Sequence, residues 1–325
     1  MQQNKEHTFN TEVNTDIQKA VTLLCNDEIV AIPTETVYGL AGNALSPNAI
    51  TKIYTAKKRP FFNPLILHTY HIDAITEFAF VNEAALQLMQ HFMPGPFTIL
   101  LTKKDIVPDL LTAGSYKVAI RIPAHEITQS LLTQLPFPLA APSANPFGYI
   151  SPVTASHVYE HLKGEIPYVL DGGACSVGVE STIVEVTTEQ IIIHRLGGIG
   201  KEAIEAVATL PVVLQQKHAP IATSGQLKSH YAPSTPLLMG DVATLIHQHI
   251  GKKIAVISFY ETYSGVDNYA LSTSKSLAMA ASNLFATLHK IDAKDYDVIV
   301  AEKFPEEGIG AAINDRLERA QFIHK

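Results

Sequence analysis

The hydrophobic positions of the chain alternate between the spacing of helices and the short runs of strands. Apolar residues at positions 17, 20, 21 and 24 repeat at i, i+3, i+4 and i+7, which predicts a helix over 15–25. The apolar run 29–32 predicts a buried strand that ends at Pro33, and Ser46 followed by Pro47 is typical of a helix N-cap. The same reasoning predicts further helices near 82–91, 125–134 and 154–162, and strands at 97–102, 117–122, 138–141, 167–170, 181–187 and 190–195.

The pattern changes over residues 211–236, where proline and glycine recur without a hydrophobic period. This composition predicts an extended linker. Beyond it, 253–259 and 296–301 are predicted strands, and apolar residues at 277, 281, 284 and 288 mark a helix face between them. We therefore expect a mixed α/β first domain over 13–210, a linker over 211–236, and a small doubly wound α/β domain over 237–325.

Composition and charge narrow the class of protein. With 325 residues, 46% of them hydrophobic and 17% charged, the chain can bury the cores of two domains. A formal net charge of −7 argues against a protein whose main task is to coat nucleic acid, because that task requires an excess of cations. The first 12 residues lack the features of a signal peptide and no stretch of 18 apolar residues follows, so we expect a cytoplasmic protein without a membrane span. Cys25 and Cys175 are too few for a disulfide framework.

Several familiar binding motifs are incomplete in this sequence. The segment 197–201 lacks the glycine that a P-loop requires five residues before Gly200, where Arg195 stands. The G-x-G at 308–310 continues to Ile313 instead of a third glycine, which argues against a dinucleotide fingerprint. The 14 histidines include no H-E-x-x-H and there is no C-x-x-C pair, so no protein zinc site is predicted.

Candidate chemistry begins in the loop that follows the first predicted strand. Residues 33–40 read P-T-E-T-V-Y-G-L, which combines hydroxyl groups with a glycine that permits close backbone approach. Such a loop can hold a small polar ligand. Alternatively, its threonines stabilise a turn or cap a helix, and the sequence leaves both interpretations open.

A cluster of three cations, Lys57, Lys58 and Arg59, follows at the end of a predicted helix. One explanation is structural, because cations at a helix C-terminus offset its dipole and bond its last carbonyl groups. The other is a triphosphate site, since arginine supplies a planar fork and lysine a mobile point charge for phosphate oxygens.

Other polar residues stand within or at the ends of predicted strands. Arg121 lies in the apolar strand 117–122 and therefore needs a carboxylate partner from either the protein or a ligand. Ser143 and Asn145 follow the strand 138–141, and Ser181 begins another. Polar residues at strand ends are typical of ligand sites at the edges of α/β sheets.

In their order along the chain, these motifs resemble those of the YrdC family in its long, two-domain form. The match comprises P-T-E-T-V-Y-G-L at 33–40, K-x-R-P at 57–60, N-P-L-I at 63–66 with His68, M-P-G-P-F-T at 93–98, R-I-P at 121–123, A-P-S-A-N at 141–145, D-G-G at 171–173 and E-S-T-I-V at 180–184. H-Y-A-P at 230–233 resembles the family's linker signature, and G-I-G-A-A-I-N-D-R-L at 308–317 resembles its closing segment. The likeness covers nearly the whole chain and implies a twisted mixed sheet with helices and an open concave groove.

The resemblance also implies an activity. The family condenses L-threonine, bicarbonate or CO2, and ATP to threonylcarbamoyl-AMP and pyrophosphate, and the product goes to a tRNA-modifying threonylcarbamoyl transferase. Carried over by position, the residues implied to hold threonine or its carbamate are Thr34, His68, Arg121 and Ser181. Those implied to contact ATP are Lys57, Arg59, Ser143, Asn145, Ser151, Arg195 and Tyr231. Mg2+ is expected to accompany ATP without protein ligands that the sequence identifies.

The chain departs from the family pattern at three positions. Lys58 replaces the glycine of K-G-R-P, Leu196 replaces the proline of R-P-G, and Ser224 replaces a proline before the linker glycine. Lys58 adds charge near the expected phosphates and can alter the geometry of the loop. Because proline mainly restricts the backbone, we expect the changes to affect the stiffness of a lid more than the type of reaction. The linker with His230 and Tyr231 is the candidate lid over an intermediate that water would destroy.

Three alternatives remain at this stage. Carbamoyl-adenylate chemistry occurs in related domains of hydrogenase-maturation proteins, but their acylphosphatase and zinc-finger segments are missing from this sequence. An RNA-binding module would use the basic groove, which the net charge and the lack of an aromatic and basic stripe disfavour. The C-terminal domain could also serve only as a scaffold or regulatory element.

Overall fold

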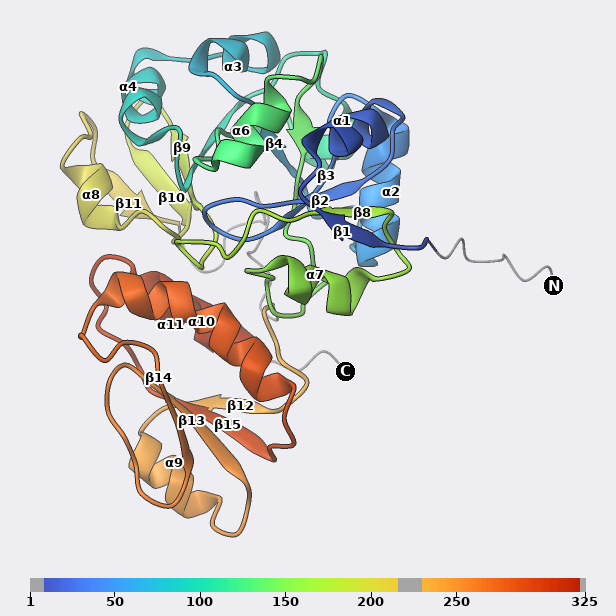
Figure 1. Ribbon diagram of the computed structural model, residues 1–325. Helices are drawn as coiled ribbons and strands as arrows, with labels where there is room; N and C mark the ends of the chain where they lie inside the picture. Colours follow the sequence, from blue (N-terminus) through green and yellow to red (C-terminus); the bar gives the residue numbers. More distant parts are fainter. Residues whose placement is uncertain (1–8, 216–229, 322–325) are drawn as a thin grey trace.

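The computed structural model describes residues 9–215 and 230–321, which form two sheets with their helices (Figure 1). The larger sheet pairs its strands in both parallel and antiparallel fashion, which confirms the predicted twisted mixed sheet. In spatial order its eleven described strands are β1 (Glu12–Asn14), β8 (Tyr168–Leu170), β2 (Val30–Ile32), β3 (Gly39–Asn43), β7 (Leu139–Ala140), β4 (Ile66–His68), β6 (Lys117–Arg121), β5 (Phe97–Thr102), β9 (Thr182–Val186), β10 (Ile191–Arg195) and β11 (Val212–Leu214).

Helices cover both faces of this sheet. They are α1 (Ile17–Cys25), α2 (Pro47–Lys57), α3 (Ile72–Phe78), α4 (Glu83–Phe92), α5 (Asp109–Thr112), α6 (Glu126–Leu132), α7 (Ala155–Leu162) and α8 (Lys201–Glu205). Val30 and Ile32 pack with α1 and α6, whereas Ala31 between them packs with the core on the α2 side, as alternation along a strand requires. Ser46 caps α2 as predicted, with its Oγ accepting from the Ala49 amide at 3.3 Å.

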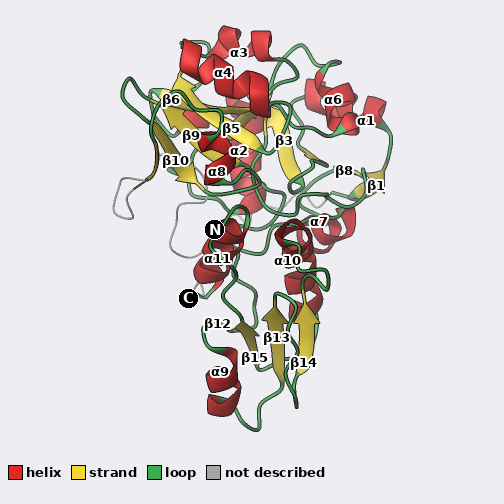
Figure 2. Cartoon of the chain, turned by 90° about the vertical axis from the view of Figure 1, so that its left-hand side faces the viewer, coloured by secondary structure: helices red, strands yellow, loops and turns green. Residues whose placement is uncertain are grey.

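The second sheet is small and entirely parallel. Its strands, in spatial order, are β12 (Leu237–Met239), β15 (Val298–Ala301), β13 (Ile254–Ser258) and β14 (Asp267–Ala270). Its helices are α9 (Val242–Gln248), α10 (Leu277–Asp292) and α11 (Gly310–Ala320). Figure 2 shows α9 apart from α10 and α11, and Val256 packs toward α9 while its neighbours Ala255 and Ile257 join the core that contains α10. Helices on both faces confirm the predicted doubly wound domain.

The segment predicted as a linker, 211–236, begins with a packed strand. Its residues 212–214 form β11, which pairs in parallel with β10 of the larger sheet. Pro211 directly precedes this short apolar run, and the prolines and glycine of the wider segment favoured the prediction of a linker. Residues 216–229, including Ser224, lie outside the described residues. None of the helices in the described part of the chain is long and apolar enough to cross a membrane.

The two domains touch through α10 and α11, which face the larger sheet in Figure 1. Gly178 has a φ of +76°, and a Cβ there would lie 2.5 Å from the Cα of Ser282 in α10, so only glycine fits this approach. Nearby, the ring of His289 in α10 stacks on that of His157 in α7, with centroids 4.0 Å apart. The second domain is therefore in direct contact with the domain that carries the site motifs.

Candidate active site

Strand register brings the site residues of the larger sheet together. β4 and β6 are parallel, and their register places His68 beside Arg121. Arg121 in turn lies opposite Thr98 of β5, whose hydroxyl is 2.7 Å from that of Ser181. Three residues far apart in sequence thus become neighbours because the strand ends meet at one edge of the sheet.

A cavity of about 50 Å³ lies at this edge and is lined by residues of the first domain and of the segment that joins the domains. The predicted site residues that line it are Arg59, His68, Arg121, Ser143, Ser181, Arg195, His230 and Tyr231. Four others, Thr34, Lys57, Asn145 and Ser151, are buried behind its wall and do not line it. Glu180 lines the cavity as well and was not among the predicted site residues.

The residues behind the wall hold it in place. The Thr34 hydroxyl donates to the Val37 carbonyl at 2.6 Å and accepts from the Val37 amide at 3.2 Å, so this threonine stabilises the turn. The Asn145 side-chain amide donates to the Tyr149 carbonyl at 2.9 Å. Ser151 donates to Glu180 Oε1 at 2.6 Å, which makes it a support for a residue that does line the cavity.

Two members of the cation cluster, Lys57 and Arg59, are buried and donate hydrogen bonds to backbone carbonyl groups, whereas Lys58 is exposed. Lys57 Nζ donates to the carbonyl oxygens of Ser143, at 2.5 Å, and Asn145. Arg59 Nε donates to the carbonyl of Asn63 at 3.1 Å. Burial, and then the charge of Arg59, lowers the pKa of Lys57 well below its ordinary value, and burial lowers that of Arg59 to about 10. Neither forms an ion pair with a carboxylate among the described residues, so an anionic ligand would stabilise the charged form of each side chain.

Arg121 and His68 line the cavity from the neighbouring strands β6 and β4. The Arg121 guanidinium pairs with the carboxylate of Glu35, with Nη2 2.8 Å from Oε1, so the protein itself supplies a partner. Its Nε also donates to the Gly95 carbonyl at 3.3 Å. Burial, and then the charge of Arg121, lowers the pKa of His68 to about 3, which keeps the imidazole neutral. Its Nδ1 donates to the Ile66 carbonyl at 3.1 Å, which leaves Nε2 with a lone pair.

Arg195 and Glu180 border Ser181 on its other side. Arg195 donates to the Ser181 carbonyl from Nε, at 3.1 Å, and from Nη2, at 2.9 Å. Burial alone would raise the pKa of Glu180, but Arg316 and then Arg195 hold it below its ordinary value, so the carboxylate stays ionised. A charged residue at the edge of an apolar strand was the signal that singled out Arg121, and the same signal could have found Glu180.

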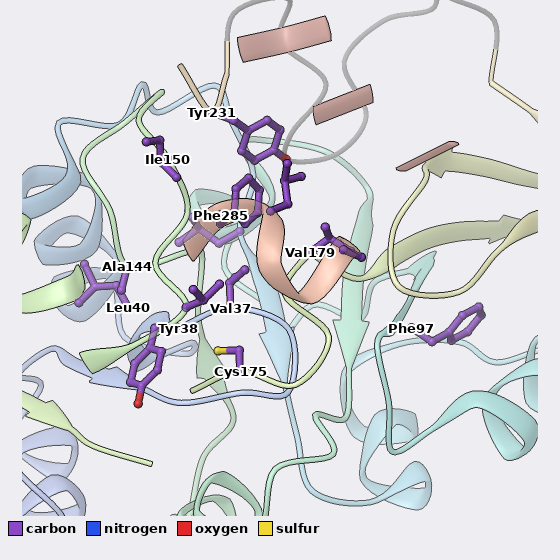
Figure 3. Close-up of a cluster of buried hydrophobic side chains, with 14 of the residues drawn as sticks. Val37, Tyr38, Leu40, Phe97, Ala144, Ile150, Cys175, Val179, Tyr231 and Phe285 are labelled. Carbon is purple, nitrogen blue, oxygen red and sulfur yellow. The ribbon is translucent and has the colours of Figure 1, made fainter. Parts of the chain in front are cut away.

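His230 and Tyr231 close the cavity from the segment that joins the two domains. Tyr231 has a φ of +64°, a left-handed conformation that is strained for a residue with a side chain. Its ring packs against that of Phe285 in α10 (Figure 3), and the two ring centroids are 5.5 Å apart. The Tyr231 hydroxyl and His230 Nδ1 are buried without a hydrogen-bond partner among the described residues. Such atoms are costly unless a ligand or water satisfies them, and both atoms belong to residues that line the cavity.

Comparison with known proteins extends this picture. Residues 22–197 match the Sua5–YciO–YrdC family model, described as telomere recombination, and residues 199–321 match the model described as the threonylcarbamoyl-AMP synthase C-terminal domain. A threonylcarbamoyl-AMP synthase from Bacillus subtilis is 38% identical over 94% of this chain and 92% of its own length. One from Pyrococcus abyssi is 37% identical over 94% and 93%. The crystal structure of P. abyssi Sua5 complexed with L-threonine superimposes with a TM-score of 0.87 and 34% identity, over 96% of this chain and 97% of that one.

Proposed function

Since this chain belongs to the Sua5–YrdC family in its two-domain form, we propose that it makes threonylcarbamoyl-AMP and pyrophosphate from L-threonine, bicarbonate or CO2, and ATP. The observation that carries the proposal is the cavity rim, where the buried cations Lys57 and Arg59 lie close to a pocket lined by Arg121, Arg195 and hydroxyl groups. A site of this kind suits a substrate with a carboxylate together with a substrate that carries phosphates.

The residues around the cavity divide into two groups by chemistry. Arg121 can form a charge-assisted hydrogen bond with the carboxylate of threonine, and the free lone pair of His68 can accept from its amino or hydroxyl group. Arg59, Ser143 and Arg195 also line the cavity and carry hydrogen-bond donors that suit a nucleotide. This division assigns threonine to the β4–β6 edge and ATP to the segment that follows β7.

The reaction then needs positioning and charge neutralisation more than a nucleophilic side chain. A carbamate oxygen forms a bond to the α-phosphorus of ATP, and the bond from that phosphorus to the bridging oxygen of pyrophosphate breaks. Negative charge shifts onto the departing pyrophosphate, where Arg59 lines the cavity and the protonated form of the buried Lys57 would lie behind it to stabilise that charge. The backbone carbonyl groups that hold both cations fix them before the substrate arrives.

The cavity is smaller than its proposed occupants. Pockets for small molecules have volumes of about 300–1,000 Å³, several times the 50 Å³ found here. Binding of ATP therefore requires part of the wall to move, and the segment with His230 and Tyr231 is the part with a strained backbone and unpartnered polar atoms. Its return over the bound substrates would exclude the water that hydrolyses an acyl adenylate.

Magnesium fits this site as part of the ATP substrate. Among residues 9–215 and 230–321 no group of three or more His, Cys, Asp or Glu side chains could hold a metal ion. The carboxylate of Glu180, which lines the cavity, already accepts from Ser151 and Arg316. We therefore propose that Mg2+ arrives on the phosphate oxygens and keeps water as its other ligands.

The proposal predicts pyrophosphate release that requires both threonine and bicarbonate. Arg59→Met should lower kcat/KM by roughly 10²–10³-fold, the size typical of removing one stabilising donor, with the fold checked by thermal unfolding. Lys201→Met, which removes an exposed i,i+4 ion pair with Glu205, is the matched control and should leave the rate unchanged. Pyrophosphate release that proceeds equally well without threonine would refute the proposal.

The fate of the product follows from the same proposal. Threonylcarbamoyl-AMP is a reactive mixed anhydride, so it must be consumed quickly by an enzyme that transfers the threonylcarbamoyl group to tRNA. The cytoplasm is the proposed compartment, because that tRNA-modifying step takes place where tRNA is handled. An acyl acceptor other than tRNA that consumes the product at a comparable rate would revise this part.

A further inference from the structure

The closing segment of the chain, 308–317, has no role in the reaction proposed above, yet it reaches the cavity wall. Arg316 of α11 is the largest fully buried side chain in the described part of the protein. Its Nε donates to Glu180 Oε2 at 2.8 Å, and its Nη2 donates to the Leu196 carbonyl at 2.8 Å. Glu180 and Leu196 belong to the first domain, so one side chain of the second domain binds the first domain at two points.

The same guanidinium also contacts the segment between the domains. Its central carbon lies 5.2 Å from the centroid of the Tyr231 ring, within the range of a cation–π interaction. Tyr231 is fully buried, and its hydroxyl has no hydrogen-bond partner among the described residues. Arg316 is thus placed to hold a strained aromatic residue against the cavity.

The rest of the closing segment fixes Arg316 in this position. A Cβ at Gly310 would lie 2.1 Å from the Pro305 carbonyl oxygen, so the start of α11 requires glycine. The Asn314 side chain both accepts from the Phe304 amide and donates to the Phe304 carbonyl, each at 2.9 Å. Asp315 accepts from Arg316 Nη1 at 2.7 Å. The motif therefore sets the position and the orientation of one guanidinium.

From these contacts we infer that Arg316 is a positioning residue for nucleotide binding, through which the C-terminal domain holds Tyr231 and Glu180 at the wall of the cavity. The inference rests on the proposed function for the identity of the ligand. It gives the second domain a defined role, because Arg316 of that domain fixes two residues that line the cavity, Glu180 of the first domain and Tyr231 of the segment between the domains. Without Arg316, Tyr231 loses the contact that stabilises its left-handed conformation, and Glu180 becomes a buried charge without its counterion.

The test is direct binding of a non-hydrolysable ATP analogue, with a methylene group between the α and β phosphorus atoms, to the full chain by calorimetric titration. Arg316→Met should weaken binding by about tenfold or more, and Arg316→Lys by less, because an ammonium can remain over the Tyr231 ring. Tyr149→Phe removes the hydrogen bond from Tyr149 to Asp292, another contact between the two domains, and should leave affinity unchanged.

A double variant separates positioning from the cost of an unpaired charge. Arg316→Met with Glu180→Gln removes that charge, so its melting temperature should recover while its nucleotide affinity stays low. Recovery of both, or an affinity of the single variant within twofold of the natural chain, would overturn the inference.

Turnover adds an independent readout. If the proposed function holds, Arg316→Met should raise KM for ATP and leave KM for threonine within about twofold, whereas a general loss of structure would change both. Should the natural chain release no pyrophosphate in the presence of threonine and bicarbonate, the proposed function fails. The binding titration would still decide the role of Arg316.

Discussion

The ion pair between Glu35 and Arg121 gives a quantitative test of where threonine binds. The two side chains are 8% and 5% exposed, and Nη2 lies 2.8 Å from Oε1. Replacing Glu35 by glutamine leaves the guanidinium buried without its counterion, which typically costs about 3–5 kcal/mol. At roughly 2–4 °C per kcal/mol for a domain of this size, the melting temperature should fall by about 10 °C.

L-Threonine should reverse part of this loss if its carboxylate binds Arg121. In the natural chain the ligand carboxylate shares the guanidinium with Glu35, whereas in Glu35→Gln it supplies the missing negative charge. We expect affinity for threonine to rise by about tenfold, equivalent to about 1.4 kcal/mol. Thermal unfolding at saturating threonine should therefore show a larger upward shift for the variant than for the natural chain.

Two controls make the result specific to that carboxylate. L-Threoninamide, which has no carboxylate, should not stabilise the variant. Glu185→Gln disrupts another partly buried ion pair, with Lys117, and changes the hydrogen bond between Glu185 and His194; these residues do not line the cavity. It should lower the melting temperature without changing the response to threonine. An equal response of Glu35→Gln and the natural chain, or stabilisation by the amide, would show that Arg121 does not receive the carboxylate.

Three further predictions concern single positions. Lys58→Gly should stabilise the protein by roughly 0.5–1 kcal/mol in chemical denaturation, because Lys58 ends α2 in the left-handed conformation, with a φ of 52°; a loss of stability would contradict this. Burial lowers the pKa of His157, His161 and His289, that of His289 to about 3, so the unfolded chain binds protons that the folded chain excludes as pH falls below about 6.5. The melting temperature should therefore drop from pH 7 to pH 5, and His289→Gln should flatten that slope; equal slopes would be contrary evidence. Thr34→Val should destabilise the turn by about 1–3 kcal/mol, whereas Thr34→Ser keeps its hydroxyl and should have little effect; equal losses would argue against the turn.

The sequence pattern predicted the elements better than their contacts. Periodicity located α10 and the strands β13 and β15 of the second domain because those segments are long or strongly apolar, but it did not find β12 or β14. It missed β11, because a run of three apolar residues directly after Pro211 is too short to predict a strand. Local patterns contain no record of register, so nothing in the chain near Arg121 indicated that its partner would be Glu35, 86 residues away.

For the candidate site, too, the sequence predicted which residues belong to it better than it predicted their contacts. Family motifs identified most of the residues that line the cavity, but motif membership does not say which way a side chain points. Lys57 belongs to the expected cation cluster, yet its ammonium group is directed to the Ser143 carbonyl behind the wall. The hydroxyl of Thr34 is of a type that can bind a ligand, but here it donates to the Val37 carbonyl and stabilises a turn. Only the packing of neighbouring strands decides between these uses of the same residue.

The distribution of charge around the cavity explains why these supports are needed. Arg121 and Arg316 each pair with a carboxylate, whereas the hydrogen bonds of Lys57 and Arg59 go to carbonyl dipoles, which stabilise a cation less than a full negative charge does. The unliganded site is therefore less stable than a fully paired one, and an anionic ligand gains the difference on binding. Because the carbonyl groups already fix the cations, little reorganisation is required when phosphate arrives. The two complete ion pairs keep the rest of the wall rigid enough for that arrangement to persist without substrate.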